Sequence, residues 1–414
     1  MNLPLFLARH LYHAAGGSRR ASRPAVVIAQ AGIALGLAVM MVSVCVIVGF
    51  KSQVRGLTVG FGGDMQVNNL QQMQPYEAVP MTVDDRLLAT LSACPDVEHV
   101  QRYALRAGLL LTDSAFQGVV LKGLGGEYDT TFLRSHLVKG ALPAFNDTAA
   151  TNEVLLSQDV AQAMRLDVGS RVSLYFIDGE VRTRRPRVAG IYRTGFAEVD
   201  GMLLFTDMRT VQRLNGFAPD QAGGVEIRLK DGADLEQCTW QTGDALSRMR
   251  GSRGEQYAVR NVEQLNPALF SWLGILDVNI WVILALMAGV AAFTMTCGLL
   301  ILILERTQTI GVLKSLGASD RLVRRSFLAL GLMLIVRGMA VGNLIALGIC
   351  VLQRLTGLVT LDSSTYYMDT VPVAFPLPAL LLLNVCTFLL SVLILWLPTS
   401  LILRIRPADS MRYE

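Results

Sequence analysis

One short polar segment decides how this chain is organised: Leu304-Glu305-Arg306-Thr307-Gln308-Thr309-Ile310-Gly311-Val312-Leu313-Lys314-Ser315-Leu316-Gly317-Ala318. It separates two long apolar runs, 278–304 and 327–352. Ile310, Leu313 and Leu316 recur every three residues, which places them on one stripe of a helix. Gly317 follows, where a left-handed helix cap favours a residue without a Cβ. The pattern predicts an amphipathic helix between two membrane spans, with an apolar stripe that docks on another surface or rests on lipid headgroups.

The composition indicates an integral membrane protein. The chain has 414 residues, of which 52% are hydrophobic and 17% are charged, and its mean hydropathy is +0.43. Soluble globular chains average about 25% charged residues, so low charge combined with long apolar runs points to a membrane. The net charge of +4 is modest and gives no indication of a nucleic-acid partner.

Basic residues set the expected topology. They cluster before the first apolar run, between the second and third runs and after the fourth, whereas segment 357–371 contains no Lys or Arg. The positive-inside rule places these clusters in the cytoplasm. Run 25–50 is too long for a signal-peptide core, so we expect an uncleaved first span. The clustered residues are Arg9, Arg19, Arg20, Arg23, Arg306, Lys314, Arg321, Arg324, Arg325, Arg404, Arg406 and Arg412.

The sequence therefore predicts four spans, with both termini in the cytoplasm and one large domain outside. The expected segments, in chain order, are a cytoplasmic segment 1–24, transmembrane helix 1 at 25–50, a periplasmic α+β domain 51–270, transmembrane helix 2 at 271–304, a cytoplasmic coupling helix 305–325, transmembrane helix 3 at 326–356, a periplasmic loop 357–375, transmembrane helix 4 at 376–402 and a cytoplasmic tail 403–414.

Within the large outer domain, the pattern mixes helices and strands. Strand, helix and strand signals follow one another at 64–112 and again at 225–261, on either side of a strand-rich middle section. Because both units connect directly to spans, we expect them to pair into one subdomain near the membrane. Asp178-Gly179 predicts a hairpin between a strand at 171–177 and a strand at 181–193. Cys94 ends one predicted helix and Cys238 begins the other, and a parallel packing of these helices would keep the two thiols too far apart for a disulfide.

The sequence contains no recognised catalytic or metal-binding motif. A phosphate-binding GxxxxGK[ST] loop, a GxSxG elbow, HExxH and Cys/His clusters are all absent. We therefore expect no enzymatic activity, no metal site and no cofactor bound by this chain. If the protein is powered by ATP, a separate ATPase subunit must supply the work through the helix at 305–325.

The outer halves of the first two spans suggest a substrate groove. One interpretation is lipid contact with an aromatic belt, and the other is an acyl-chain groove between subunits, lined by adaptable methionines. The groove residues would be Met40, Met41, Val44, Ile47, Val48, Phe50, Leu276 and Ile280. Asp277, near the mouth, would meet a lipid headgroup or a lysine. Asn343 and Asn384 lie at matching depth in the third and fourth spans, which allows an interhelical hydrogen bond worth about 1 kcal/mol.

Several motifs resemble one family. Glu305-Arg306, Ile310-Gly311, Leu313-Lys314 and Leu316-Gly317-Ala318 resemble the cytoplasmic coupling segment of FtsX-like permeases, the transmembrane subunits of mechanotransmitting ABC transporters. Thr309 departs from that pattern, because the family usually has an acid there. Val48-Gly49-Phe50-Lys51, Ala197-Glu198-Val199-Asp200-Gly201, the segment 364–373 and Arg406-Pro407-Ala408 resemble the lipoprotein-releasing, LolC/LolE-type branch of the family.

The resemblance implies an α-helical membrane protein with four transmembrane helices and a large α+β extracytoplasmic domain, a MacB/LolC-like periplasmic core. It also implies extraction of lipoproteins from the outer leaflet of a Gram-negative inner membrane, for delivery to the outer membrane. The implied partners are a second permease copy or paralogue and a LolD-like ATPase dimer that binds ATP and Mg²⁺. The residues implied for ATPase coupling are Glu305, Arg306, Ile310, Gly311, Leu313, Lys314, Leu316 and Gly317.

The resemblance leaves the periplasmic partner open. LolC captures a LolA-like carrier with a long hooked hairpin, whereas the corresponding hairpin here, 176–186, is short. Its Arg182, Arg184 and Arg185 form either a solvated strand face or a docking surface for an acidic carrier. Two alternatives share the fold: a MacB-like efflux permease, which normally carries a fused amino-terminal ATPase domain, and an FtsX-type regulator of periplasmic hydrolases, which moves no substrate.

Overall fold

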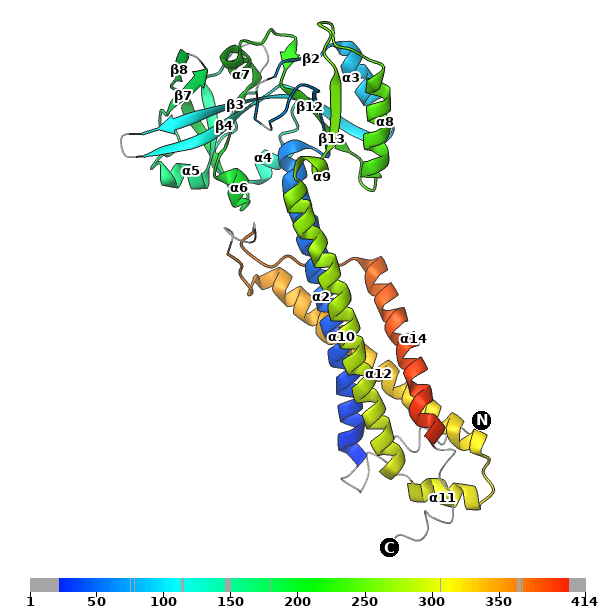
Figure 1. The fold of residues 1–414 in the computed structure, drawn as a ribbon. Helices are drawn as coiled ribbons and strands as arrows, with labels where there is room; N and C mark the ends of the chain where they lie inside the picture. The colour runs from blue at the N-terminus through cyan, green and yellow to red at the C-terminus, as the bar shows by residue number, and fades with distance from the viewer. Residues whose placement is uncertain are drawn as a thin grey trace. The chain divides into compact units, whose positions relative to one another are not determined.

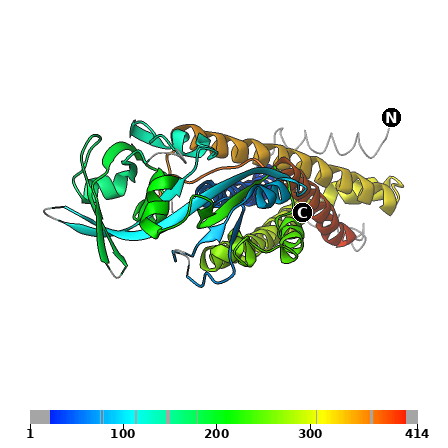
Figure 2. The same ribbon diagram turned by 90° about the horizontal axis from the view of Figure 1, so that it is seen from above.

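The computed structural model describes residues 22–74, 76–77, 79–112, 115–145, 150–178, 180–305, 307–362, 366 and 368–401. By its contacts the chain divides into two compact units. The helical unit comprises Met1–Ser52, Trp272–Val359 and Val371–Glu414, and the sheet unit comprises Gln53–Ser271 and Thr360–Thr370. Figures 1 and 2 show the elements of each unit from two directions.

Four helices among the described residues are long and apolar enough to cross a membrane. They belong to α2 (Ser22–Gly62), α10 (Pro267–Glu305), α12 (Asp320–Thr356) and α14 (Leu377–Leu401). A short helix, α11 (Thr307–Ser315), connects α10 to α12 (Figure 1). The number of predicted spans therefore agrees with the number of candidate spans. The predicted coupling helix 305–325 is shorter in the structure, because α11 ends at Ser315 and the residues from Asp320 onward already belong to α12.

The first two spanning helices are longer than the sequence suggested. α2 continues past Phe50 as far as Gly62. Lys51 and Arg55 mark where the apolar run ends, but a charge does not end a helix that has a further surface to pack on. α10 begins at Pro267, and proline suits the first helical turn. The division between the two units therefore falls within both helices, after Ser52 in α2 and after Ser271 in α10.

Small residues let α2 pack closely on its neighbours. A Cβ added at Gly36 would lie 3.1 Å from the Cβ of Ala291 in α10, and one added at Gly342 of α12 would lie 2.7 Å from the carbonyl oxygen of Ala34. Backbones this close hold together by van der Waals contact. Between α12 and α14, the Asn343 Nδ2 donates to the Asn384 Oδ1 at 2.8 Å, which confirms the predicted hydrogen bond.

The sheet unit is built on an eleven-stranded mixed sheet. Nine strands follow the order β13-β1-β12-β3-β4-β10-β6-β9-β5, and β7 and β8 branch from β3. The strands are β1 (Met65–Asn69), β3 (Val97–Leu111), β4 (Phe116–Leu124), β5 (Leu137–Gly140), β6 (Glu153–Ser157), β7 (Ser173–Asp178), β8 (Glu180–Arg184), β9 (Arg187–Tyr192), β10 (Leu203–Asp207), β12 (Gly224–Leu229) and β13 (Tyr257–Asn261). A separate two-stranded sheet pairs β2 (Met81–Thr82) with β11 (Gln221–Ala222).

Seven shorter helices complete the sheet unit in the described part of the chain. They are α3 (Asp85–Ser92), α4 (Thr131–Ser135), α5 (Gln158–Ala163), α6 (Ala197–Asp200), α7 (Met208–Asn215), α8 (Leu235–Ser247) and α9 (Val262–Leu265). Side chains cap several of them: Asp84 accepts from the Leu87 amide at the start of α3, and Asp234 accepts from two amides at the start of α8.

One half of the sheet has a split βαβ arrangement. β1, α3 and β3 form one unit, β12, α8 and β13 form the other, and their strands interleave as β13-β1-β12-β3. This is the ferredoxin-like βαββαβ pattern, and it confirms the predicted pairing of the two units. β3 is long enough to pair with β12 near its start and with β4 and β7 further on, so it joins the two halves of the sheet (Figure 2).

The two helices of this half pack in opposite directions. β1 and β12 are antiparallel, so α3 and α8, which follow them, also run in opposite senses. The parallel packing expected for these helices is therefore wrong, and the end of α3 lies toward the start of α8. Cys94 and Cys238 are free thiols in the structure, and burial, followed by nearby charges that include Cys94, raises the pKa of the Cys238 thiol.

The predicted hairpin is confirmed, but its second strand is shorter than expected. β7 and β8 pair in antiparallel register, with Ile177 opposite Val181; Gly179 of the turn lies outside the described residues. The expected strand 181–193 divides into β8 and β9. Pro186 falls between them, and proline lacks the amide that a continuous strand would donate. β9 instead pairs with β6 and β5.

Candidate functional site

The helix between the second and third spans ends as its sequence requires. Gly317 has a φ of +91°, and the Ala318 amide donates to the Leu313 carbonyl at 3.0 Å, which closes α11 with a left-handed cap. Ser319 then accepts a hydrogen bond from the Leu322 amide and begins α12. Arg306, one of the predicted coupling residues, lies outside the described residues.

The predicted docking stripe of α11 does not form one exposed face. Ile310 is 1% exposed and packs with Leu302 and Ile303 of α10 and with Val323 and Phe327 of α12. Gly311 is also buried, and Leu313 is half-buried. Three-residue spacing identifies neighbours on a helix, but it cannot show which side faces the rest of the chain. Ile310 therefore attaches α11 to its own helices.

The outward apolar side chains of α11 are Val312 and Leu316. They are 51% and 78% exposed, and their spacing of four residues places them side by side on the helix surface. Glu305 and Gly317 are exposed as well. The Lys314 ammonium lies 2.9 Å from the Asp320 carboxylate, and the lysine side chain is 9% exposed. Its charge is thus held within the turn between α11 and α12.

Four of the predicted groove residues are buried in the helical unit. Met40 and Met41 are each 3% exposed, Val44 is 7% and Phe50 is 8%. The first three pack with residues of α12, α14 and the segment that precedes α14, and the Ala374 amide donates to the Cys45 carbonyl at 3.1 Å. The methionine-rich face of α2 is therefore filled by the chain's own helices and does not line an open groove.

The exposed apolar surface nearby belongs to α10. The other four predicted groove residues are half-buried: Ile47 and Val48 of α2, and Leu276 and Ile280 of α10. Val278, Trp281 and Val282 are 62%, 72% and 59% exposed. Trp281 is one of the aromatic and aliphatic residues with which the second span opens in the sequence. The sequence pattern missed Val278 and Val282, because an apolar run with no polar face does not distinguish its buried side from its exposed side.

An ion pair and an aromatic pair join α2 to α10 beside this surface. The Lys51 ammonium lies 2.7 Å from an Asp277 carboxylate oxygen, so the lysine expected as one possible partner of Asp277 is confirmed. The rings of Phe50 and Trp272 meet edge to face with centroids 5.6 Å apart. Ion pairs with half-exposed partners contribute at most about 1 kcal/mol, so this contact positions the helices more than it stabilises them.

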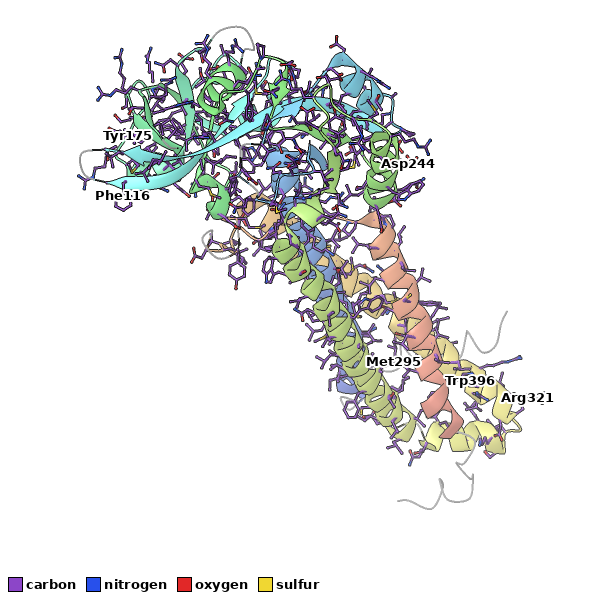
Figure 3. All side chains as sticks on the ribbon, turned by 45° about the horizontal axis from the view of Figure 1, so that its top comes forward. Phe116, Tyr175, Asp244, Met295, Arg321 and Trp396 are labelled. Carbon is purple, nitrogen blue, oxygen red and sulfur yellow. The ribbon has the colours of Figure 1, made fainter. Side chains whose placement is uncertain are left out.

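The hairpin arginines divide into one that is engaged and two that point outward. Arg182 donates to the Leu214 carbonyl of the α7 segment at 2.9 Å, whereas Arg184 and Arg185 are exposed. Exposed apolar side chains lie on the same hairpin and on the neighbouring β3–β4 arm, with Ile177 at 74%, Val181 at 66% and Phe116 at 74%. Figure 3 labels Phe116 at the end of that arm and Tyr175 on β7.

A metal centre has no candidate in the described part of the chain, since no group of three or more His, Cys, Asp or Glu side chains converges there. The surfaces described above are the coupling helix, the exposed side of α10 and the β7–β8 hairpin. Each is suited to protein or lipid contacts rather than to bond-breaking chemistry.

Two family models match the chain. Residues 26–240 match the MacB-like periplasmic core domain, and residues 281–407 match the FtsX-like permease C-terminal domain. Similar structures include the periplasmic region of MacB from Actinobacillus actinomycetemcomitans, with 15% identity, a TM-score of 0.35 and coverage of 51% of this chain and 94% of that one. The extracellular domain of the transporter YknZ has 12% identity, a TM-score of 0.33 and coverage of 48% and 99%.

Relatives with assigned functions align over almost the whole chain. The lipoprotein-releasing system transmembrane protein LolC of Xylella fastidiosa is 23% identical over 407 residues, with 92% of each chain covered. LolE of Haemophilus influenzae is 21% identical, with 91% and 92% covered. The pyoverdine export ATP-binding/permease protein PvdT of Pseudomonas putida is 24% identical, with 92% of this chain but 56% of that protein covered. Because the core-domain model spans more than half of the chain and the permease model covers the carboxyl-terminal helices, this chain belongs to the family of FtsX-like permeases with a MacB-like periplasmic core domain.

Proposed function

We propose that this chain is the permease subunit of an ABC transporter that extracts lipoproteins from the outer leaflet of a Gram-negative inner membrane for delivery to the outer membrane. The observation that carries the proposal is the end-to-end alignment with lipoprotein-releasing permeases, which covers 92% of both chains for LolC of Xylella fastidiosa. An alignment of this kind includes the coupling segment, the spans and the outer domain together.

The architecture supports work transmitted from a separate ATPase. In the chain, α10 follows the edge strand β13 after the short helix α9, and α11 follows α10. Since α11 offers Val312 and Leu316 outward, we assign the contact with a LolD-like ATPase dimer to this face. ATP and Mg²⁺ would bind in that dimer, and this chain would hydrolyse nothing itself. A second permease copy or a paralogue would complete the membrane assembly.

The substrate surface is assigned to the exposed side of α10. Val278, Trp281 and Val282 offer an apolar surface that suits acyl chains, and the same surface contacts membrane lipids when no substrate is bound. Movement of α2 away from α12 and α14 would add Met40, Met41 and Val44 to it. A LolA-like carrier would receive the lipoprotein at the β7–β8 hairpin, where Arg184 and Arg185 suit an acidic surface.

One specific observation favours a second candidate function. The alignment with the pyoverdine export protein covers 92% of this chain, nearly as much as the alignments with lipoprotein-releasing permeases. An efflux permease for a small amphiphile would use the same coupling helix and the same side of α10.

Crosslinking in intact cells separates these functions. A photoreactive residue at exposed Val278 or at half-buried Leu276 should capture triacylated lipoproteins and lose them on ATP turnover. Val44, which is buried, serves as the matched position and should capture substrate only in an opened state. Capture of a small amphiphile would support the efflux function, and capture of a periplasmic hydrolase would support a regulator. Capture of lipids alone at all three positions would contradict the proposal.

A further inference from the structure

The carboxyl end of α2 is held by side chains of the sheet. The last carbonyls of a helix lack partners within the helix. Here the Lys122 ammonium donates to the Phe61 carbonyl, and the Gln66 Nε2 donates to the Gly62 carbonyl at 3.1 Å. Gly63 then turns the chain into β1 with a φ of +72°. A cation at this end also matches the negative end of the helix dipole.

Lys122 belongs to a buried ion pair in the middle of the sheet. Its ammonium on β4 lies 2.5 Å from a Glu226 carboxylate oxygen on β12, and the two side chains are 4% and 1% exposed. The Gln101 Nε2 of β3 donates to the other carboxylate oxygen at 3.0 Å. Three neighbouring strands thus meet at one charge pair directly beneath the helix end.

Tyr103 extends this network toward β1. Its ring lies 5.3 Å from the Lys122 ammonium, and its hydroxyl donates to the Gln66 Oε1 at 3.0 Å. Burial, and then the charge of Glu226, raise the pKa of Tyr103 well above its ordinary value. The hydroxyl therefore keeps its proton and remains a donor across the physiological range of pH.

The side chain of Phe61 is held as firmly as its carbonyl. Its ring stacks on Phe205 with centroids 6.2 Å apart and meets Phe132 edge to face at 5.1 Å. Tyr192 lies 6.4 Å away. This aromatic cluster includes residues of β10, β9 and α4. On the backbone side, Lys122 of β4 donates to the Phe61 carbonyl and is itself paired with Glu226 of β12. Phe61 is therefore fixed on both sides.

The start of α10 is attached differently. α9 begins with a capping box between Asn261 and Gln264. At its other end, Asn266 leaves helical geometry, with a φ of −127° and a ψ of 58°, before α10 begins at Pro267. Residues 263–271 are all exposed or half-buried, and half-buried Leu269 is their one side chain that packs against the cluster of Phe61, Tyr192 and Phe205. A change in backbone direction beside a segment that is only partly buried makes this junction more compliant than the end of α2.

We propose that Lys122, Glu226 and Phe61 form a rigid joint between α2 and the sheet, so that α2 moves the sheet as one body while α10 bends at Asn266. The inference rests on the proposed function, in which movement of the spanning helices reaches the outer domain. Lys122 is a positioning residue, because it fixes the helix end through the Phe61 carbonyl. A buried ion pair is seldom more stabilising than apolar side chains of the same size, but its directional contacts hold the helix end in one position.

Distance measurements on the full-length chain, assembled with its ATPase in lipid nanodiscs, test the joint. Spin labels carried on unnatural amino acids at Arg55 of α2 and Lys230 after β12 report on the joint, and labels at Ser271 of α10 and Lys230 report on the other junction. We expect the first distance to be the same with and without trapped ATP, and the second to change. Equal changes in both distances would overturn the proposal.

Paired variants show whether the charge pair is responsible. Lys122→Met with Glu226→Gln removes both charges and should let the first distance shift with ATP. Lipoprotein release per ATP should fall about tenfold, the factor expected for losing one hydrogen bond from a charged donor. The matched control is Arg102→Met with Glu127→Gln. These two residues form an ion pair with an N–O distance of 2.7 Å that does not involve α2, so the control should change neither the first distance nor lipoprotein release.

Two further outcomes are decisive. If the double variant keeps an unchanged first distance and full release, the joint is not made by Lys122 and Glu226. If the double variant does not fold, Phe61→Leu, compared with Leu269→Ala at the other junction, gives the answer: only Phe61→Leu should free the first distance. Should the wild-type chain move no lipoprotein, the proposed function fails, but the distances still report on the joint.

Discussion

Replacing the outward side chains of α11 should detach the ATPase without unfolding the chain. Leu316 is 78% exposed and Val312 is 51% exposed, so Leu316→Asp and Val312→Asp leave the packing of the chain almost intact. Docking on a partner can still bury the exposed share of both side chains. Burying a whole aliphatic side chain contributes about 1.5–3 kcal/mol. Burying the exposed fractions of these two side chains would therefore contribute about 2–4 kcal/mol to the binding free energy.

This magnitude corresponds to a weakening of about 30- to 1,000-fold in the Kd for the ATPase. The assay is titration of the purified ATPase onto the chain in nanodiscs, with thermal unfolding of each variant measured alongside. Ser315→Asp, which adds the same charge at an exposed polar position of the same helix, is the control and should bind within about threefold of the wild type.

Ile310→Ala provides the contrast. Ile310 is 1% exposed, and truncating a buried isoleucine costs about 2–5 kcal/mol of stability, so this variant should lower the Tm of the chain itself. The reasoning is refuted if Leu316→Asp and Val312→Asp bind the ATPase as tightly as wild type. It is also refuted if they lower the Tm as much as Ile310→Ala does.

Three other predictions test separate contacts. Asn343→Ala and Asn384→Ala should each lower the free energy of unfolding by about 0.5–1 kcal/mol. The double variant should lower it by less than the sum of the two in thermal unfolding, because the 2.8 Å hydrogen bond is lost only once; additive losses would contradict the pair. Burial raises the pKa of Glu127, but the Arg102 hydrogen bonds outweigh it and hold that pKa below its ordinary value of 4.5. The carboxylate therefore adds stability above about pH 4.5 that is lost as pH falls, and the Tm of wild type should drop more on acidification than that of Glu127→Gln; parallel pH profiles would count against it. Cys238 is 4% exposed and its thiol pKa is raised, so iodoacetamide should modify it more slowly than Cys94 at neutral pH, as mass spectrometry of timed samples can show; faster labelling of Cys238 would refute this order.

Local patterns in the sequence were sufficient for the four spans, the helix between the second and third, and the two strand–helix–strand units. Long apolar runs gave the four spans, and Gly317 marked the end of α11. The matched depth of Asn343 and Asn384 identified a contact between two helices. Each of these inferences needs only helical geometry or side-chain chemistry within a short window.

The same patterns could not predict which side of a helix is buried or in which direction two helices pack. Ile310 and Leu316 occupy equivalent positions in the sequence stripe, yet one is buried and the other exposed, because that outcome depends on where α10 and α12 lie. Met40, Met41 and Val44 are buried for the same reason. The antiparallel packing of α3 and α8 follows from the strand order, which depends on pairing between residues far apart in the chain.

Lys122 is a charged residue inside an otherwise apolar stretch of β4. It stands in the run Val119-Val120-Leu121-Lys122-Gly123-Leu124, and a lysine within an apolar strand is either at an edge or paired. Its partner, Glu226, is separated from it by 104 positions, so the sequence alone signals a buried charge without naming what neutralises it.

The packing of α2 explains how a displacement at α11 could reach this joint. α11 is fixed to α10 and α12 through Ile310. α2 meets these two helices closely, because an added Cβ would be tight at Gly36 and would have no room at Gly342. Contacts between backbones have no flexible side chain to absorb a small shift. At the other end of α2, Phe61 is fixed by Lys122 and by the aromatic cluster. A helix held stiffly along its length and at its end transmits a shift instead of absorbing it. With the proposed joint, the sheet would therefore follow a displacement at α11 through α2, whereas the chain changes direction at Asn266 before it enters α10.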